Sequence, residues 1–140
     1  MIPWLFMLLA SQQQVPYSVS IQLSVSARED AAAPILQSCI AGKLQAINGV
    51  SVSMSKGAKY RVIVLILFSE GSWSASAITT TQAARALGQS NIDDKIHIFM
   101  DANIFSGRNL DSICAGVAAS IDVDTIQHDR SVWLESRNQE

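Results

Sequence analysis

The chain has 140 residues, a formal net charge of −2 and a hydrophobic fraction of 49%, which suits a single domain with one core. Its charged residues make up 16% of the sequence, below the usual quarter, and the basic ones are scattered between Arg28 and Arg137. A nucleic-acid-binding domain gathers Lys and Arg on one face. We therefore expect no nucleic-acid partner.

The chain opens with an apolar, uncharged run over residues 2–10. This run is too short for the roughly 20 residues that span a membrane, but it fits the roughly 7–15 residues of a signal-peptide core, and Ala10 suits a cleavage point. Because no Lys or Arg precedes the run, we expect residues 1–15 to be a truncated signal segment whose true start lies upstream. The alternative is an apolar strand or helical turn of a cytosolic protein. A lipid anchor would need a Cys after the cut, and position 11 is Ser.

The first half of the domain predicts a strand, a helix and a short strand. Residues 17–25 alternate apolar residues with Ser and Gln, which is the period of a strand with one buried face. A helical apolar stripe follows over residues 31–47, and Asn48-Gly49 supplies a left-handed stop. Alternation returns over residues 50–54, which predicts the short strand.

The strongest core signal is the unbroken apolar run over residues 62–68. Such a run predicts a strand that is covered on both faces or lies in the centre of the sheet. A hairpin turn at Ser69–Ser72 then leads into residues 73–81, which predict an antiparallel return strand. Residues 82–94 fit either a short helix or a long loop, and residues 95–102 predict a further strand.

The last predicted element is a helix over residues 110–121, whose apolar residues recur at helical spacing without a miss. Asn109 or Ser106 can cap its N-terminus. The sequence turns polar from Asp122, and we expect residues 128–140 to form a polar surface tail.

These elements follow the order β-α-β-β-β-β-α. Two amphipathic helices cover only one face of a sheet, and the Ser and Gln positions of the first strand suit the other face. We therefore predict an α+β fold in which residues 16–127 form a two-layer sandwich. It has a mixed sheet of about five strands with two helices on one face, and its first strand–helix–strand unit makes a right-handed crossover.

The two cysteines, Cys39 and Cys114, lie on or beside the apolar faces of the two predicted helices. Since both helices pack on the same side of the sheet, a disulfide would link them and close a loop of about 75 residues, worth roughly 4 kcal/mol in the chain-entropy model. The alternative is two free buried thiols that pack as small apolar groups. The disulfide suits an exported protein, whereas the cytosol keeps such thiols reduced.

The candidate catalytic pair is His97 and Asp101, which share one face of a predicted strand. Four residues separate them by about 13 Å, too far for a base and the carboxylate that orients it. The Ser-rich turn over residues 69–74 lacks the G-x-S-x-G elbow of a serine nucleophile. We therefore predict no catalytic residue.

A second candidate is His128 with Asp122, Asp124 and Asp129, which have the ligand types of a divalent-cation site. Their spacing matches no EF-hand loop, since the turn glycine and the final Glu are absent. The glycines of the chain are not clustered as a phosphate-binding loop requires. We predict no metal site and no cofactor.

Three stretches of the chain resemble small exported bacterial domains. They are Ile21-Gln22-Leu23-Ser24-Val25, Leu44-Gln45-Ala46-Ile47-Asn48-Gly49-Val50 and Ala58-Lys59-Tyr60-Arg61-Val62-Ile63-Val64. Their order of strand, helix, short strand and Tyr-led apolar strand is similar to that of the N-terminal domain of TolB and of CsgG-like envelope domains. The resemblance covers residues 17–130 at the level of pattern. It implies an assembly or docking role rather than an enzyme, and it carries over no functional residue.

Three hypotheses follow for the function. The first is a non-enzymatic periplasmic or secreted domain that contacts a protein partner, of unknown identity, through its Ser- and Gln-lined sheet face or an edge strand. It has no stable membrane insertion after processing, and a homo-oligomer is kept open. The second is a small hydrolase that uses His97 or the acidic C-terminal segment. The third is a cytoplasmic regulatory module, which the redox state of Cys39 and Cys114 would distinguish from the first.

Overall fold

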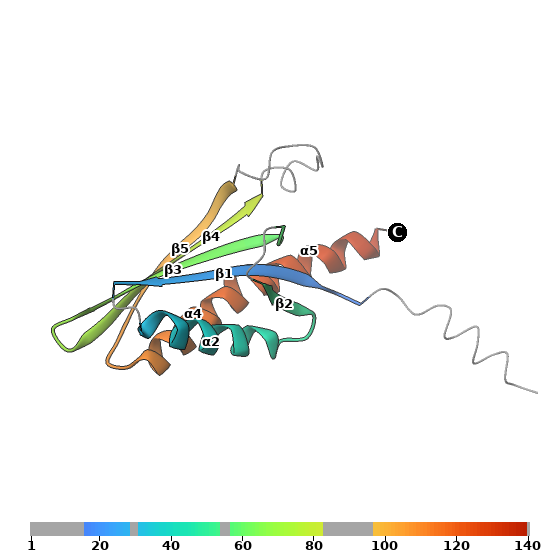
Figure 1. Cartoon of the computed structure of the whole chain (residues 1–140). Coiled ribbons are helices and arrows are strands. Elements are labelled where there is room, and N and C mark those ends of the chain that lie inside the picture. Colours follow the sequence, from blue (N-terminus) through green and yellow to red (C-terminus); the bar gives the residue numbers. More distant parts are fainter. Residues whose placement is uncertain (1–15, 29–30, 54–56, 83–96, 140) are drawn as a thin grey trace, which may run out of the picture.

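The computed structural model describes residues 16–28, 31–53, 57–82 and 97–139. It shows the predicted α+β fold with the predicted order of elements, followed by one more helix (Figure 1). The strands are β1 (Val19–Ala27), β2 (Val50–Ser53), β3 (Tyr60–Ser69), β4 (Ser72–Gln82) and β5 (His97–Gly107). The helices are α2 (Ala32–Gln45), α4 (Leu110–Ile121) and α5 (Gln127–Asn138), with the π-helical segment η1 (Asp122–Ile126) between the last two. The expected signal segment and all but the first residue of the segment 82–94 lie outside the described residues.

The five strands form one mixed sheet in the order β2-β1-β3-β4-β5. β1 is parallel to both of its neighbours, β2 and β3, whereas β3, β4 and β5 form an antiparallel meander. The predicted hairpin between β3 and β4 is confirmed, with turn residues Glu70 and Gly71 at φ 53° and 76°. Left-handed values at both central residues belong to the tight turn whose twist matches that of the flanking strands.

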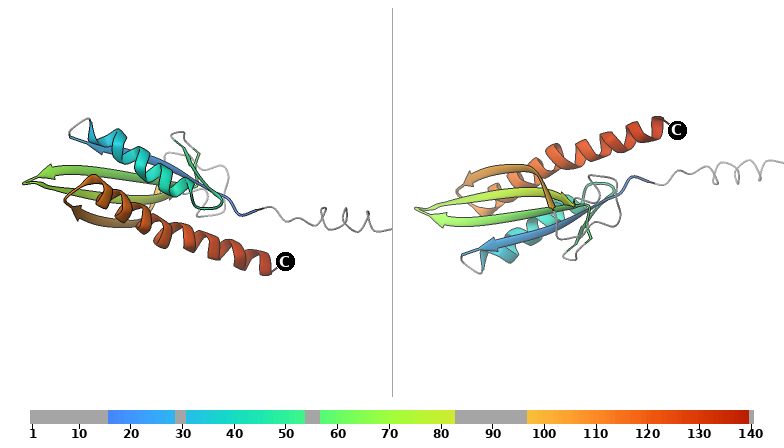
Figure 2. Two further views of the ribbon diagram at one scale, coloured as in Figure 1. Left: turned by 90° about the horizontal axis from the view of Figure 1, so that it is seen from below. Right: turned by 90° about the horizontal axis from the view of Figure 1, so that it is seen from above.

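The helices α2 and α4 lie side by side on one face of the sheet (Figures 1 and 2). α2 packs on β1 and β2, and α4 packs on β4 and β5. Each fully buried Val, Leu or Ile stabilises the fold by about 1.5–3 kcal/mol, so this interface supplies most of the hydrophobic stability. The largest fully buried side chains are Ile21, Leu23, Leu36, Ile40, Leu44, Ile113, Ile126, Val62, Val64, Val117 and Cys114.

Local signals in the sequence set the ends of both helices. Pro34 lies in the first turn of α2, where its missing N–H costs no hydrogen bond. Gly49 follows α2 with φ +85°, and a Cβ there would lie 2.4 Å from the carbonyl oxygen of Tyr17, so only glycine fits. Asn109 caps α4 as predicted, since its Oδ1 accepts a hydrogen bond of 2.8 Å from the Ser112 N–H.

The C-terminal segment differs from the expected surface tail. Residues 127–138 form α5, which continues the line of α4 through η1 toward the end of the sheet where β1 and β3 begin (Figure 2). Thr125, Ile126 and Asp129 are buried in this segment. The partners of Asp129 come from the N-terminal half of the chain, so the local polar pattern could not reveal the anchor that orders the helix. None of the described helices is both long and apolar enough to cross a membrane.

β3 lies in the centre of the sheet, but its apolar run is not covered on both faces. Val62 and Val64 are fully buried under the helices, whereas Leu65 and Leu67 on the opposite face are each 49% exposed. Within the described part of the chain, no element packs on that opposite face. We call it the open face of the sheet.

Candidate functional site

A buried carboxylate near the C-terminus, Asp129, gathers three polar side chains from the N-terminal half of the chain. Tyr60 and Tyr17 donate their hydroxyl protons to its Oδ1 and Oδ2 at 2.6 and 2.7 Å. Lys59 forms an ion pair with Oδ1 at 2.5 Å. We call Tyr17, Lys59, Tyr60 and Asp129 the Asp129 node. Since both carboxylate oxygens accept hydrogen bonds, the node satisfies a charge that would be costly to bury alone.

The charges of the Asp129 node are fixed by its own contacts. Burial favours the neutral acid, but hydrogen bonds from Lys59, Tyr60 and Tyr17, together with the Lys59 charge, outweigh it and lower the pKa of Asp129. Burial and the hydrogen bond to the carboxylate raise the pKa of Tyr17 and of Tyr60. At neutral pH the node therefore holds one carboxylate and two neutral phenols, and it has no general base poised near pH 7.

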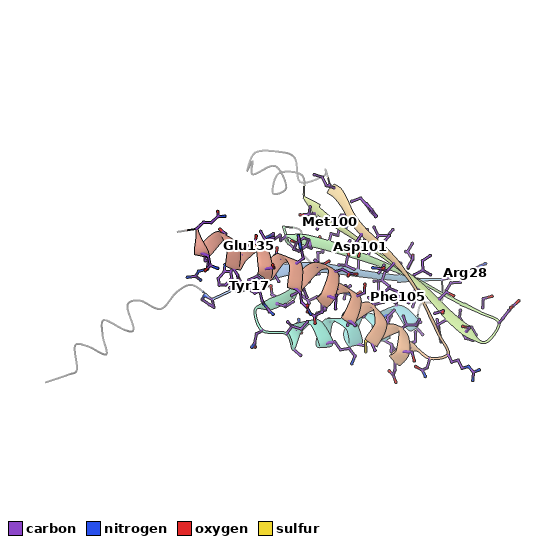
Figure 3. The ribbon with its side chains drawn as sticks, turned by 180° about the vertical axis from the view of Figure 1, so that it is seen from behind. Tyr17, Arg28, Met100, Asp101, Phe105 and Glu135 are labelled. Atoms are coloured by element: carbon purple, nitrogen blue, oxygen red, sulfur yellow. A yellow bond between two sulfur atoms is a disulfide. The ribbon has the colours of Figure 1, made fainter. Side chains whose placement is uncertain are left out.

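The Asp129 node attaches α5 to the start of β1 and β3. Tyr17 lies just before β1, on the side of α5 (Figure 3). The ring of Trp133 packs edge-on against Tyr17 with centroids 5.4 Å apart, and the Arg130 guanidinium lies 4.9 Å from the centre of the Tyr17 ring. Arg130 also donates to the Asn48 carbonyl at 2.8 Å. These contacts line one side of an open groove that includes Ile47 and Gly49. Because each polar group binds another group of the chain, we interpret the node as a structural anchor.

A second polar cluster ties the edge strand β5 to the helical layer. Asn103 Nδ2 lies 2.9 Å from both Asp101 Oδ2 and Ser120 Oγ, and Ser120 donates to Asp124 Oδ2 at 3.1 Å. The other Asp101 oxygen accepts the backbone N–H of Ala102 at 2.9 Å (Figure 3). Asp101 therefore accepts hydrogen bonds from its own strand, and its role is to hold the local structure of β5.

The sequence candidates for catalysis and metal binding do not converge in the described part of the chain. Asp101 binds Ala102 and Asn103, and the side chain of His97 lies outside the described residues. His128 is exposed, and no group of three or more potential metal ligands forms among the described residues. The Ser-rich turn is the β3–β4 hairpin. Among the described residues, these contacts therefore form no catalytic arrangement that would support the hydrolase hypothesis.

The carboxylates of the acidic segment serve separate purposes. Asp124 bonds to Ser120 beside β5, whereas Asp129 belongs to the Asp129 node at the other end of the helical segment. Asp122 ends α4 as its C-cap residue.

The two cysteines meet between the helices. Cys39 of α2 and Cys114 of α4 form a disulfide with Cα atoms 6.1 Å apart. This places the link inside the covered layer, where Cys114 is fully buried. Whether native material carries the bond stays a prediction, which intact mass measures directly.

The open face is polar over β1 and mixed over the other strands, since β3 and β5 present Leu and Ile whereas β4 presents Ser74, Ser76 and Thr80 beside Ile78. The strand pairing places its side chains in rows that run across the sheet. One row holds Ser26, Leu65, Ser76 and Ile104. The next row toward the start of β3 holds Ser24, Ile63, Ile78 and Ala102. The sequence predicted the Ser- and Gln-lined part of this face and not the apolar part.

The apolar patch of the open face is hollowed along β4. We define the patch as Ile63, Leu65, Leu67, Ile78 and Ile104. Ser74 and Ser76 are shorter than the Leu and Ile side chains on either side, and a hollow of about 260 Å³ lies there between the leucines of β3 and Ile104 of β5. Ile104 is 86% exposed and projects beside this hollow.

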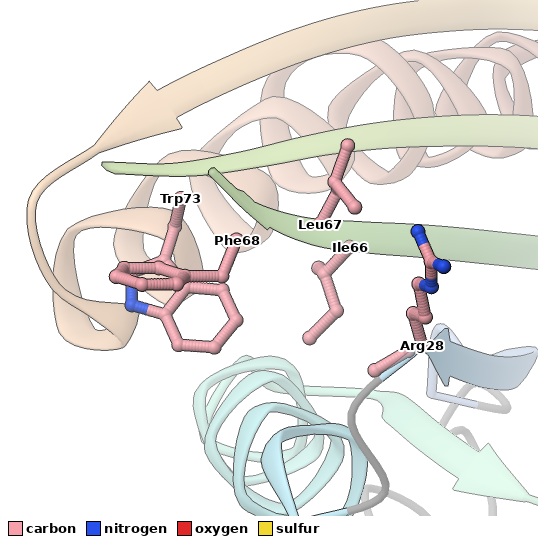
Figure 4. Close-up of a pocket in the computed structure, with 6 residues that line it drawn as sticks. Arg28, Ile66, Leu67, Phe68 and Trp73 are labelled. Atoms are coloured by element: carbon pink, nitrogen blue, oxygen red, sulfur yellow. The ribbon is translucent and has the colours of Figure 1, made fainter. Parts of the chain in front are cut away.

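A second pocket lies where the β3–β4 hairpin extends past the end of β1 (Figure 4). Ile66 forms its floor, Arg28 lies at one side, and Phe68 and Trp73 lie at the other with ring centroids 4.8 Å apart. Its volume is about 330 Å³.

Two groups of residues escaped the sequence interpretation. The sequence assigns Tyr17 and Tyr60 to strands and gives Lys59 no role, because their common partner Asp129 lies far along the chain. Leu65 and Leu67 were assigned to the core with the rest of their apolar run. No local signal separates them from Val62 and Val64.

No family model matches the chain, and no curated protein matches it in sequence. Among solved structures it is similar to the PelC dodecamer from Paraburkholderia phytofirmans. A single-substitution variant of that dodecamer is 12% identical, with a TM-score of 0.45 and coverage of 78% of this chain and 90% of that chain. A second crystal form of the dodecamer is also 12% identical, with a TM-score of 0.44 and coverage of 78% and 92%. A likeness at this level carries no argument about function.

Proposed function

We propose that this protein is a non-enzymatic docking module that contacts a protein chain through the open face of its sheet. The observation that supports the proposal most directly is the apolar patch, in which Leu65, Leu67 and Ile104 are 49%, 49% and 86% exposed. Soluble monomers rarely expose contiguous apolar patches of more than a few hundred Å², and larger ones mark interaction surfaces.

The surroundings of the patch also suit an interface. Ser24 and Ser26 border it on β1, while Ser106 borders it on β5. An apolar centre with a hydroxyl-rich rim is the arrangement of protein–protein contacts, where the rim keeps its hydrogen bonds with water. The exposed Phe99 extends the apolar surface along β5.

We further propose that the module works in the periplasm or outside the cell. The apolar leader predicted over residues 2–10 and the Cys39–Cys114 disulfide both support export, because disulfides persist in oxidising compartments. Intact-mass analysis of protein from its native host should find the leader removed and the two sulfur atoms oxidised. Two reduced thiols on an unprocessed chain would favour the cytoplasmic regulatory module.

The docking proposal is tested by removing the apolar patch while leaving the core unchanged. In native-host extracts fractionated by size, the wild-type chain should migrate in a complex larger than one copy. The double variant L67S/I104S should migrate as a single copy, because it replaces two exposed anchors of the patch with serine. The matched control A119S changes an exposed residue on α4 and should stay in the complex. If all three chains migrate alike, the open face is not the docking surface.

A further inference from the structure

The open face has features of a surface that can pack against a copy of itself. A two-fold symmetric contact brings the same patch from each chain together, so any charge inside it would face a like charge. The outward side chains of β3, β4 and β5 in the rows of Leu65 and Leu67 carry no charge. They are Leu65, Ser76 and Ile104 in one row and Leu67, Ser74 and Ser106 in the other, and the charged Arg28 lies beside Leu67 just after β1, outside the apolar patch.

Shape supports the same partner. Each copy has a projecting Ile104 and, next to it, the hollow above Ser74 and Ser76. Consider a two-fold axis that lies between the two sheets and runs across the strands, midway between the row of Leu65 and the row of Leu67. Rotation about this axis reverses the strand direction in the second copy. It then places each Ile104 over Ser106 of the other copy, beside the hollow, and each Leu65 over the other copy's Leu67. Such exchange of projection and hollow is what a two-fold contact requires.

The charges at the two ends of the face are complementary under this arrangement. Arg61 lies on the open face, and its buried Nε has no hydrogen-bond partner among the described residues. It is five residues from the proposed axis, about 16 Å along the strand, and the exposed Glu70 of the hairpin lies at a similar distance on the other side. Strand reversal therefore brings Arg61 of one copy opposite Glu70 of the other, twice by symmetry.

The overlap of the two copies is confined to β3, β4 and β5, because β2 and nearly all of β1 lie on one side of the axis. Three strands about 4.8 Å apart and nine residues of about 3.3 Å give about 430 Å² per copy, roughly half of the 800 Å² per partner of a standard interface, so we expect a weak dimer that forms as the concentration rises. The edge strand β5 is a weaker route to pairing, because Asp101 already occupies the backbone N–H of Ala102.

We propose that the partner of the open face is a second copy of this chain, packed sheet against sheet with antiparallel strands and with Arg61 of each copy paired to Glu70 of the other. This inference rests on the proposed docking function and names the partner of that same surface.

Sedimentation equilibrium of the full chain over a concentration series tests the inference. The wild type should form a dimer as the concentration rises. I104K should raise the dimer dissociation constant at least about a hundredfold, because it places a charge in the apolar contact. A119K, on the exposed side of α4, is the matched control and should leave the constant unchanged. Far-UV circular dichroism shows that each variant is folded.

A charge exchange tests the orientation independently of the apolar contact. R61E and E70R should each weaken the dimer about tenfold, because each turns two attractive pairs into two repulsive ones. The double variant R61E/E70R should restore the constant to within about twofold, since it rebuilds both pairs in the opposite sense.

Three results would overturn the inference: a monomeric wild type at all concentrations, a dimer that I104K leaves intact, or a double variant that is no tighter than the two single ones. The purified wild type could be monomeric while L67S/I104S still abolishes the complex seen in native-host extracts. That result would support the docking function but show that the partner is a different protein. A wild type that migrates as a single copy in extracts would overturn both the docking function and the second copy as its partner.

Discussion

The two faces of the sheet differ although the same strands build both. On the covered face, Val62 and Val64 of β3 are fully buried beneath α2 and α4, and a disulfide links the two helices. On the open face, Leu65 and Leu67 of the same strand are half exposed. The apolar residues of the first face stabilise the fold. Those of the second contribute little to it, and under the proposed function they contact another chain.

The largest effect is expected from the link inside the covered face. C39A/C114A should lower the free energy of unfolding by roughly 4 kcal/mol, because it frees a loop of about 75 residues in the unfolded chain. Urea denaturation with and without reductant measures the effect. The wild type should lose the same amount when reduced, and the double variant should not respond. A wild type that ignores reductant would show that its cysteines are not bridged.

The difference in packing between the two faces is measured by replacing one leucine with alanine on each face. L23A removes a side chain that is 1% exposed and should destabilise the chain by about 3 kcal/mol, through lost burial and a cavity. L65A makes the same change on the open face and should cost less than about 1 kcal/mol, because no cavity forms there. Both are compared by urea denaturation. Equal losses would mean that the open face is packed in the intact protein.

The Asp129 node should give the next effect. D129N removes the charge that Tyr17, Tyr60 and Lys59 bind, and we expect a loss of about 2 kcal/mol at neutral pH. D111N, an exposed carboxylate in the first turn of α4, is the control and should change stability by less than about 0.5 kcal/mol.

The pH dependence of the Asp129 node follows from the shifted pKa values. Because the pKa of Asp129 is lower in the folded chain, its stabilisation is complete above the ordinary value of 3.8 and is lost as the pH falls through the folded-state value. The raised pKa values of Tyr17 and Tyr60 make their contribution complete below pH 10, and it is lost progressively as the pH rises from 10 through the higher folded-state values. The difference between wild type and D129N should thus be constant between pH 5 and pH 8 and shrink below about pH 4. A difference that grows on acidification would contradict this assignment.

Ile104 should contribute least to the stability of the fold and most to the association of the open face. I104S should change the free energy of unfolding of the isolated chain by less than about 0.5 kcal/mol, because Ile104 is 86% exposed. The same variant should weaken the association of the open face. Denaturation at low protein concentration separates the two quantities. A loss above about 2 kcal/mol would place Ile104 in the core of the fold.

Much of the fold could be predicted because its signals are local. The Ser- and Gln-alternating strand, the hairpin turn and the capped helix after Asn109 were confirmed, since strand period, turn residues and caps act over a few neighbouring positions.

The remaining features depend on contacts that no local pattern contains. Asp129 lies 112 positions from Tyr17 and 69 from Tyr60, so the order of α5 was invisible in its polar sequence. Likewise, an apolar run such as residues 62–68 has the same pattern whether one face is covered by helices or both are. The open face could therefore be recognised only once the helices were placed.

The central claim, that the open face is where this protein meets another chain, is tested most directly by photo-crosslinking in the native host. A photoreactive amino acid at position 104 should give covalent adducts, whereas the same group at position 119 on α4 should give none or far fewer. Adducts of twice the chain mass from position 104 would support the second copy as partner. The absence of adducts from position 104, or equal yields from both positions, would contradict the claim.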